Sequence, residues 1–225
     1  MMSIQDFDYR IFDSLVDKNV YFALYRFPGQ QELHFILQND NNAVSLNTFS
    51  GLNGKSGFVI APFHISKNNP LILIQPDVVL KGENSIFEYL SNEKFGKTVK
   101  NQVNISNQPS ASTIEQYSSK FDIFHSALKD GRFQKLVLSR TFDYERIHSL
   151  SLGSIFKKAC ETYPFNFIFL CNTPETGTWI GISPELLISE ENGNCKTVAL
   201  AGTKDMKTEE WDEKNRNEQQ IVVDY

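Results

Sequence analysis

The sequence is poor in cysteine and contains no long apolar run. Its cysteines, Cys160, Cys171 and Cys195, are an odd set without CxxC spacing, which does not suit a disulfide framework. No stretch approaches the roughly 18–20 apolar residues that a membrane helix needs, and the N-terminus shows no signal peptide. These absences predict a cytoplasmic protein with reduced thiols and no membrane-spanning segment.

The sequence also lacks an excess of basic residues. Lys and Arg number 22 against 27 Asp and Glu, which gives a net charge of −5. That balance excludes broad neutralisation of a phosphate backbone, so no nucleic-acid partner is expected. A local basic pocket for a small anion remains compatible with it. The apolar fraction of 40% over 225 residues is enough for a buried core.

Residues 1–110 are expected to form a strand-rich region. Apolar stretches at 20–27 and 33–37 flank a Pro-Gly turn signal, which is typical of adjacent strands. No residue cluster in this region carries chemistry, so we interpret it as scaffold. The polar segment 100–112 is the expected connector to a second region, residues 111–225.

The second region mixes helix and strand patterns. Ser112 and Glu115 have capping-box spacing, and the helix that they open carries apolar residues at steps of three and four until Gly131. Residues 135–140 have a strand pattern, and a second amphipathic helix is expected at 151–163. Short strand patterns follow at residues 167–171, 179–182, 186–188 and 197–200. This order predicts an α+β fold in which antiparallel or mixed sheets pack with helices.

The last segment carries a helical stripe that stops at the final residue. The stripe runs through Trp211, Asn215, Glu218, Val222 and Tyr225. No Gly, Pro or basic last turn closes it, so we expect a truncated chain whose catalytic region is incomplete at its C-terminus. An apolar stripe left open also predicts possible self-association, or a partner bound at this face.

Two charged residues fall on positions that should face inward. Glu218 lies on the stripe, where a carboxylate must be paired, protonated or bound to a metal. The plain alternative is an ion pair with a Lys or Arg, and magnesium is the cation that suits a carboxylate sharing it with water and substrate oxygens. Lys135 begins a strand pattern, where its amine either extends to solvent or, in a dry pocket, becomes a neutral general base.

Two further segments have residue types that suit a binding site. Glu185 follows Pro184 at a strand break, where a change of chain direction can aim the carboxylate into a cleft, although a solvated turn residue is the ordinary interpretation. Ala201, Gly202 and Thr203 are small residues that permit close approach of backbone donors to an anion. None of these signals is specific alone.

Four ordered motifs resemble those of the chorismate-utilising enzymes, which include isochorismate, salicylate, anthranilate and aminodeoxychorismate synthases. They are FQKLVLSR at residues 133–140, GTWIGISPE at 177–185, ALAGT at 199–203, and the helix at 211–225 with KNRNEQ at 214–219. The similarity is dense from residue 114 onward and weak before it. The resemblance implies the anthranilate synthase-like fold of this family.

Carried over residue by residue, the resemblance implies an isochorismate synthase that uses magnesium and takes chorismate as substrate. Lys135 would be the base that activates water for attack at C2, and Glu185 would be the acid that protonates the departing C4 hydroxyl. The segment 201–203 would hold a substrate carboxylate, and Glu218 would bind Mg²⁺. A base, an acid at the leaving group and a cation on the carboxylate are what this allylic substitution requires.

Single positions in the motifs separate some members of the family. Ammonia-using relatives typically carry Gln where Lys135 stands, and aminodeoxychorismate synthases commonly carry Lys where Ala201 stands, so the resemblance favours a water-using enzyme. Gln219 departs from the His that many relatives have beside the metal ligand. The family's second magnesium-ligating glutamate lies in a C-terminal half beyond these motifs, so the chain alone is expected to be inactive. Two alternatives to an isochorismate synthase remain: a salicylate synthase, and a non-catalytic module that binds a partner. If the product is isochorismate, it could serve menaquinone or siderophore biosynthesis.

Overall fold

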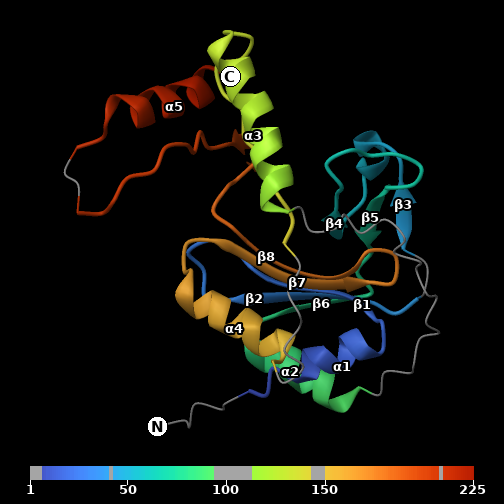
Figure 1. The fold of residues 1–225 in the computed structure, drawn as a ribbon. Helices are drawn as coiled ribbons and strands as arrows, with labels where there is room; N and C mark the ends of the chain where they lie inside the picture. The colour runs from blue at the N-terminus through green and yellow to red at the C-terminus, as the bar shows by residue number, and fades with distance from the viewer. Residues whose placement is uncertain (1–6, 41–42, 94–112, 143–149, 208–209) are drawn as a thin grey trace. The chain divides into compact units, whose positions relative to one another are not determined.

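Figure 1 shows the computed structural model of the chain, which describes residues 7–40, 43–93, 113–142, 150–207 and 210–225. The chain forms two compact units, and each is described by itself. The first unit combines Met1–Asn104 with Ile147–Pro184, and the second combines Ile105–Arg146 with Glu185–Tyr225. The units therefore interleave along the chain, and the residues at 147–184 group with the N-terminal region.

The first unit is built on a five-stranded sheet in which every neighbouring pair is antiparallel. The strand order is β6-β2-β1-β7-β8. The strands are β1 (Tyr21–Arg26), β2 (Leu33–Gln38), β6 (Val78–Lys81), β7 (Phe167–Thr173) and β8 (Gly177–Ser183). Because β1 and β2 are buried on both faces, their sequences are nearly continuous in apolar residues and do not alternate with polar ones.

Three helices cover one face of this sheet (Figure 1). They are α1 (Ile11–Asp17), α2 (Glu83–Asn92) and α4 (Leu152–Thr162). Alternate residues of β1, Phe22 and Leu24, share a fully buried cluster with Phe12, Ile86 and Phe156 of the three helices. Burial of each such side chain contributes about 1.5–3 kcal/mol, so this layer is the main hydrophobic core of the unit.

A smaller antiparallel sheet packs on the opposite face. Its strand order is β3-β5-β4, with bounds β3 (Val44–Leu46), β4 (Phe58–Ile60) and β5 (Leu71–Ile74). A short 3-10 helix at Phe49–Leu52 lies between β3 and β4 in the chain. The other alternate residues of β1, Tyr21 and Ala23, join Ile74 in a second buried cluster. The five-stranded sheet is therefore the middle layer of a stable scaffold.

The structure confirms much of the expected pattern in this unit and adds two helices. The strand-rich N-terminal region is present, the helix expected at 151–163 is α4, and the strands expected at 167–171 and 179–182 are β7 and β8. The helices α1 and α2, of 7 and 10 residues, were not expected. Helices this short depend on tertiary packing more than on local propensity, which is why the local pattern does not indicate them.

The second unit contains two helices and one hairpin among its described residues. They are α3 (Ile114–Lys129), α5 (Glu213–Asp224) and the hairpin of β9 (Ser189–Glu191) with β10 (Asn194–Lys196). Both turn residues, Asn192 and Gly193, have positive φ values of 54° and 80°, as a type I′ hairpin turn requires. The observed architecture is therefore α+β with antiparallel sheets, as expected. No helix in the described part of the chain has the length and apolarity needed to span a bilayer.

Several expected details of the second unit are corrected. Residues 135–140, 186–188 and 197–200 have no regular secondary structure, although each has a strand pattern. A strand forms only where a neighbouring segment completes the ladder of hydrogen bonds, and the described residues include no such partner for them.

The start of α3 is also displaced by one residue from the expected position. Ser112 lies outside the described residues, as does the whole of the expected connector at 100–112. The capping box is formed by Thr113 and Gln116, because the Thr113 hydroxyl accepts from Gln116 N at 3.2 Å and Thr113 N donates to Gln116 Oε1 at 3.0 Å.

Candidate active site

The end of α3 directs the chain along one side of a cavity in the second unit. Gly131 has a φ of 67°, so the helix ends in the expected left-handed conformation. Gly131 N donates to Leu128 O at 3.1 Å, and Arg132 N donates to Ala127 O at 3.1 Å. These two bonds form a Schellman motif. The residues that follow, 134–138, line the cavity.

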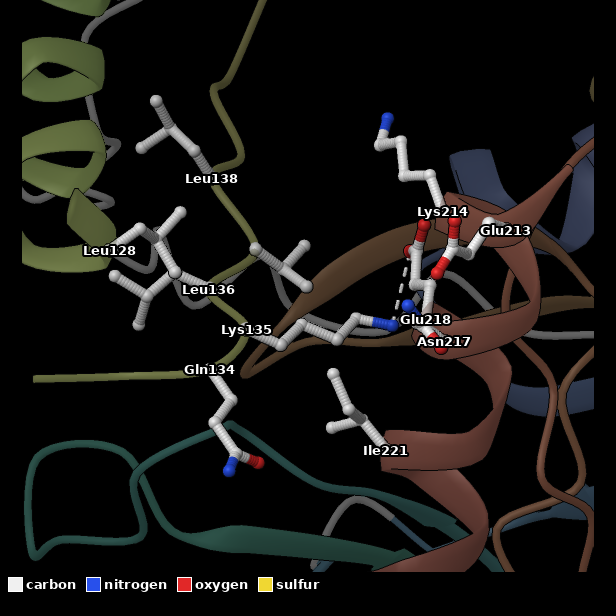
Figure 2. A pocket seen from close by; sticks show the side chains of 11 residues that line it. Leu128, Gln134, Lys135, Leu136, Leu138, Glu213, Lys214, Asn217, Glu218 and Ile221 are labelled. Carbon is white, nitrogen blue, oxygen red and sulfur yellow. Dashed lines mark ion pairs between the residues drawn. The ribbon is translucent and has the colours of Figure 1, made fainter. Parts of the chain in front are cut away.

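The N-terminal part of α5 lines the cavity from the other side (Figure 2). Asp212 caps this helix, because its Oδ1 accepts from Asn215 N at 2.7 Å. That hydrogen bond holds the pKa of the Asp212 carboxyl below its ordinary value. The helix then contributes five residues to the cavity, which are Glu213, Lys214, Asn217, Glu218 and Ile221.

Lys135 and Glu218 form an ion pair in this cavity. Lys135 Nζ lies 3.2 Å from Glu218 Oε1, and the side chains are 25% and 36% exposed. Figure 2 shows the lysine reaching from its segment to the carboxylate on α5. The cavity has a volume of about 860 Å³, within the range of small-molecule sites. Glu218 is therefore paired with a basic residue, as expected if it forms an ion pair and does not bind a metal. Its partner is Lys135, the residue that the resemblance predicts as the general base.

Apolar side chains line much of the remaining wall. They are Leu128, Leu136, Val137, Leu138 and Ile221. These side chains give the cavity an apolar surface beside the ion pair. The cavity therefore combines a cationic amine, carboxylates and an apolar surface, which suits a small organic anion that carries an apolar ring.

Residues 201–203 pack against the first turn of α5. Thr203 N donates to Asn215 Oδ1 at 2.8 Å. Gly202 has a φ of 81°, and a Cβ atom at this position would lie 2.9 Å from Asn215 O, so the close approach requires glycine. Ala201, Gly202 and Thr203 do not line the cavity of Lys135. Gly202 and Thr203 approach Asn215, which precedes Glu218 by three residues on α5.

Glu185 lies apart from the lining of this cavity. It follows β8 and Pro184, and its side chain is exposed. The cavity lining includes Lys135 and Glu218 but not Glu185. The structure thus brings together the predicted base and the predicted metal ligand, whereas the role of Glu185 as an acid stays a prediction.

Four polar residues of the cavity were missed by reasoning from the sequence. They are Gln134, Glu213, Lys214 and Asn217. Lys214 precedes Glu218 by four residues, a spacing that places both side chains on one face of a helix. This spacing is visible in the sequence and could have indicated Lys214. Gln134 has no comparable signal, because its place depends on how the chain leaves α3.

The oxygen ligands of the cavity fit a magnesium ion that is bound partly through substrate and water. Glu213 and Glu218 supply carboxylates, and Asn217 supplies an amide oxygen. In the described ranges no group of three or more His, Cys, Asp or Glu side chains is arranged to hold a metal. Mg²⁺ usually keeps several waters and binds one or two protein carboxylates. This donor set agrees with that mode of binding.

The first unit has a cavity of its own, with a different chemistry. Its volume is about 710 Å³, and its lining is mostly apolar and aromatic, with Phe58, Phe169 and Trp179 among its residues. Among the described residues of this lining Glu175 is the only charged one, and it accepts a hydrogen bond of 2.7 Å from the Tyr21 hydroxyl. An amine close to a carboxylate is found in the cavity of the second unit and not in this one.

The α+β chain has a hollow in which an amine is paired with a carboxylate, an arrangement that suits a small anion. The sequence matches the family described as chorismate binding enzyme over residues 48–225. Because this match covers most of the chain, the chain belongs to the chorismate binding enzyme family, whose small-molecule substrate is chorismate. No curated protein and no solved structure matches it.

Proposed function

We propose that this chain carries the site of an isochorismate synthase, which converts chorismate to isochorismate with the help of magnesium. The observation that supports the proposal most strongly is the ion pair of Lys135 with Glu218, at 3.2 Å, in a partly apolar cavity. The family match supplies the substrate class. Lys135 and Ala201 are the residue types that resemble the water-using members.

The reaction needs a base for the incoming water and an acid for the leaving hydroxyl. Lys135 is the proposed base: it takes a proton from the water molecule whose oxygen bonds to C2 of the ring, after it has given up its own proton and its ion pair with Glu218. Both ring double bonds shift by one position, from C1=C2 and C5=C6 to C1=C6 and C4=C5, and the C4–O bond breaks as Glu185 delivers a proton to the departing hydroxyl. One water is added and one is released, so the composition of the substrate does not change.

The remaining residues bind and orient the substrate. Gly202 N–H and the Thr203 hydroxyl are the proposed donors to a substrate carboxylate, since Thr203 N–H already donates to Asn215. Glu218, with Glu213 and Asn217 nearby in the cavity lining, would hold the magnesium ion. When bound, this ion supplies the positive charge that neutralises a substrate carboxylate.

Binding and product analysis test the proposal. We expect calorimetry to detect chorismate binding in the presence of Mg²⁺, and Glu218→Gln to weaken this binding by about tenfold or more. Lys135→Gln should lower conversion by roughly 10²–10⁴-fold, because it removes the base. Lys129→Gln, an exposed position on α3 outside the cavity, is the matched control.

The identity of the product separates members of the family. Isochorismate as the product would support the proposal. Salicylate together with pyruvate would assign the chain to the salicylate synthases. Failure to bind chorismate with Mg²⁺ present would contradict the proposal.

A further inference from the structure

The Asn215 side chain links the segment 201–203 to the cap of α5. Its Oδ1 accepts from Thr203 N at 2.8 Å. Its Nδ2 donates to both carboxylate oxygens of Asp212, at 3.0 Å each. Its own backbone N–H donates to Asp212 Oδ1 at 2.7 Å. One amide group therefore connects a loop and a helix terminus.

These contacts need an amide at position 215. The oxygen faces a backbone donor and the nitrogen faces a carboxylate, so the group must accept at one end and donate at the other. An aspartate could accept from Thr203 but would place a second negative charge beside Asp212. Gly202 approaches the backbone of Asn215 so closely that a Cβ atom on Gly202 would lie 2.9 Å from Asn215 O. This approach fixes the same segment from the backbone side.

We propose that Asn215 is a positioning residue, which sets the orientation of residues 201–203 as a receptor for a substrate carboxylate. The inference rests on the proposed function and deepens it. Asn215 engages Thr203 N–H, which leaves Gly202 N–H and the Thr203 hydroxyl to face the ligand. Asn215 also precedes Glu218 by three residues on α5, so one helix fixes both the carboxylate receptor and the metal ligand.

The contacts suggest a test of this role in which positions 212 and 215 exchange their side chains. Asn215→Asp should weaken chorismate binding in the presence of Mg²⁺ by about tenfold or more, because repulsion from Asp212 displaces the new carboxylate from Thr203 N–H and the loop loses its anchor. The double variant Asp212→Asn with Asn215→Asp exchanges the two groups, so an amide again faces a carboxylate and Thr203 N–H again has an acceptor. Asparagine caps helices as well as aspartate does. We therefore expect the double variant to restore binding to within about threefold of the wild type.

A control for the charge change lies on the same helix. Gln220 Nε2 donates to Asp224 Oδ1 at 2.7 Å, so Gln220→Glu also sets a carboxylate beside an aspartate, but away from residues 201–203. This variant should bind chorismate as the wild type does. Hydrogen exchange of the Thr203 amide, followed by NMR, reports the anchor directly: it should be protected in the wild type and the double variant, and exposed in Asn215→Asp.

The outcomes separate this inference from the proposed function. If the wild type does not bind chorismate, the proposed function fails, while the Thr203 amide still reports whether Asn215 anchors the loop. Wild-type affinity in Asn215→Asp would overturn the inference. The inference would also be overturned if the double variant bound chorismate weakly while its circular dichroism and the protection of its Thr203 amide from exchange matched the wild type.

Discussion

His34 is a titratable side chain within the aromatic layer of the first unit. Its side chain is 10% exposed and stacks on Tyr25 with ring centroids 5.2 Å apart. Burial lowers the pKa of His34, and Lys81 lowers it further, whereas Glu32 raises it. Between this lowered pKa and the unfolded value of about 6.5, the unfolded chain binds more protons. The free energy of unfolding must therefore decrease as the pH falls below about 6.5.

We predict that His34→Gln reduces this pH dependence. Urea unfolding at about pH 7.5 and about pH 5.5 should give a smaller difference in the free energy of unfolding for the variant than for the wild type, because glutamine does not titrate. His64→Gln, at an exposed histidine, should keep the wild-type difference. An unchanged pH dependence in His34→Gln would show that other groups cause the effect.

The three cysteines should differ strongly in reactivity. Burial raises the pKa of the Cys160 thiol to about 11 and that of Cys171 to about 12, whereas Cys195 is exposed on β10. Because the thiolate is the nucleophile, iodoacetamide at about pH 8 should modify Cys195 first. Mass spectrometry of the labelled peptides tests this order, and denaturant should make all three react. Rapid labelling of Cys171 in the folded protein would contradict the expected burial.

The candidate site residues could be named from the sequence, but their contacts could not be predicted from it. Glu218 is a carboxylate on an apolar helical stripe, and Lys135 opens a strand pattern, so each is conspicuous by local spacing. Their ion pair at 3.2 Å joins positions 83 residues apart (218 − 135 = 83), and no local pattern reports such a contact. Asn215 was visible in the sequence as a member of the stripe. Its hydrogen bond with Thr203 N could not be predicted, because it depends on where residues 201–203 approach α5.

Arg26 connects β1 to the end of α4. Its side chain is buried, at 2% exposure, and its guanidinium donates to the carbonyl oxygens of Cys160, Tyr163 and Asn166 at 3.2, 2.6 and 3.1 Å. A helix C-terminus leaves carbonyl groups without partners and favours a nearby cation. Arg26 supplies both the donors and the charge, so a strand residue completes the helix.

We predict that Arg26→Met destabilises the first unit by about 2–4 kcal/mol, because partly buried carbonyl groups lose their donors while the apolar stem is retained. Urea unfolding followed by circular dichroism measures the loss. Arg10→Met removes an exposed ion pair with Asp8 and should cost far less than Arg26→Met, because solvent screens exposed pairs. Equal effects of the two substitutions would mean that Arg26 does not hold α4.

Secondary structure was predictable where an element carries its own signals and was not predictable where it depends on a partner. Thr113 and Gly131 mark the limits of α3 by capping chemistry that lies within the chain segment itself. The strand pattern of residues 135–140 is also a signal within the segment itself, but no strand lies beside this segment among the described residues. Pairing is a property of the whole fold, so β propensity alone misassigns this segment.

The two units differ in how much apolar surface they bury. Among the described residues, Ala127 is the one buried hydrophobic residue of the second unit, whereas the two core clusters belong to the first. Apolar burial is the main source of stability, and segments with little of it open at low free-energy cost. The proposed site therefore lies in the less stable part of the molecule, while the first unit serves as the scaffold.

Hydrogen exchange followed by mass spectrometry should show this difference directly. We predict that amides of α3 and α5 exchange at least about tenfold faster than those of β1, β2 and β7. Ligands that bind only the folded second unit stabilise it by mass action, by about 2.7 kcal/mol at a hundred times Kd. Chorismate with Mg²⁺ should therefore slow exchange in α5 by up to about a hundredfold and leave β1 unchanged. Equal slowing in both units, or none in α5, would place ligand binding elsewhere.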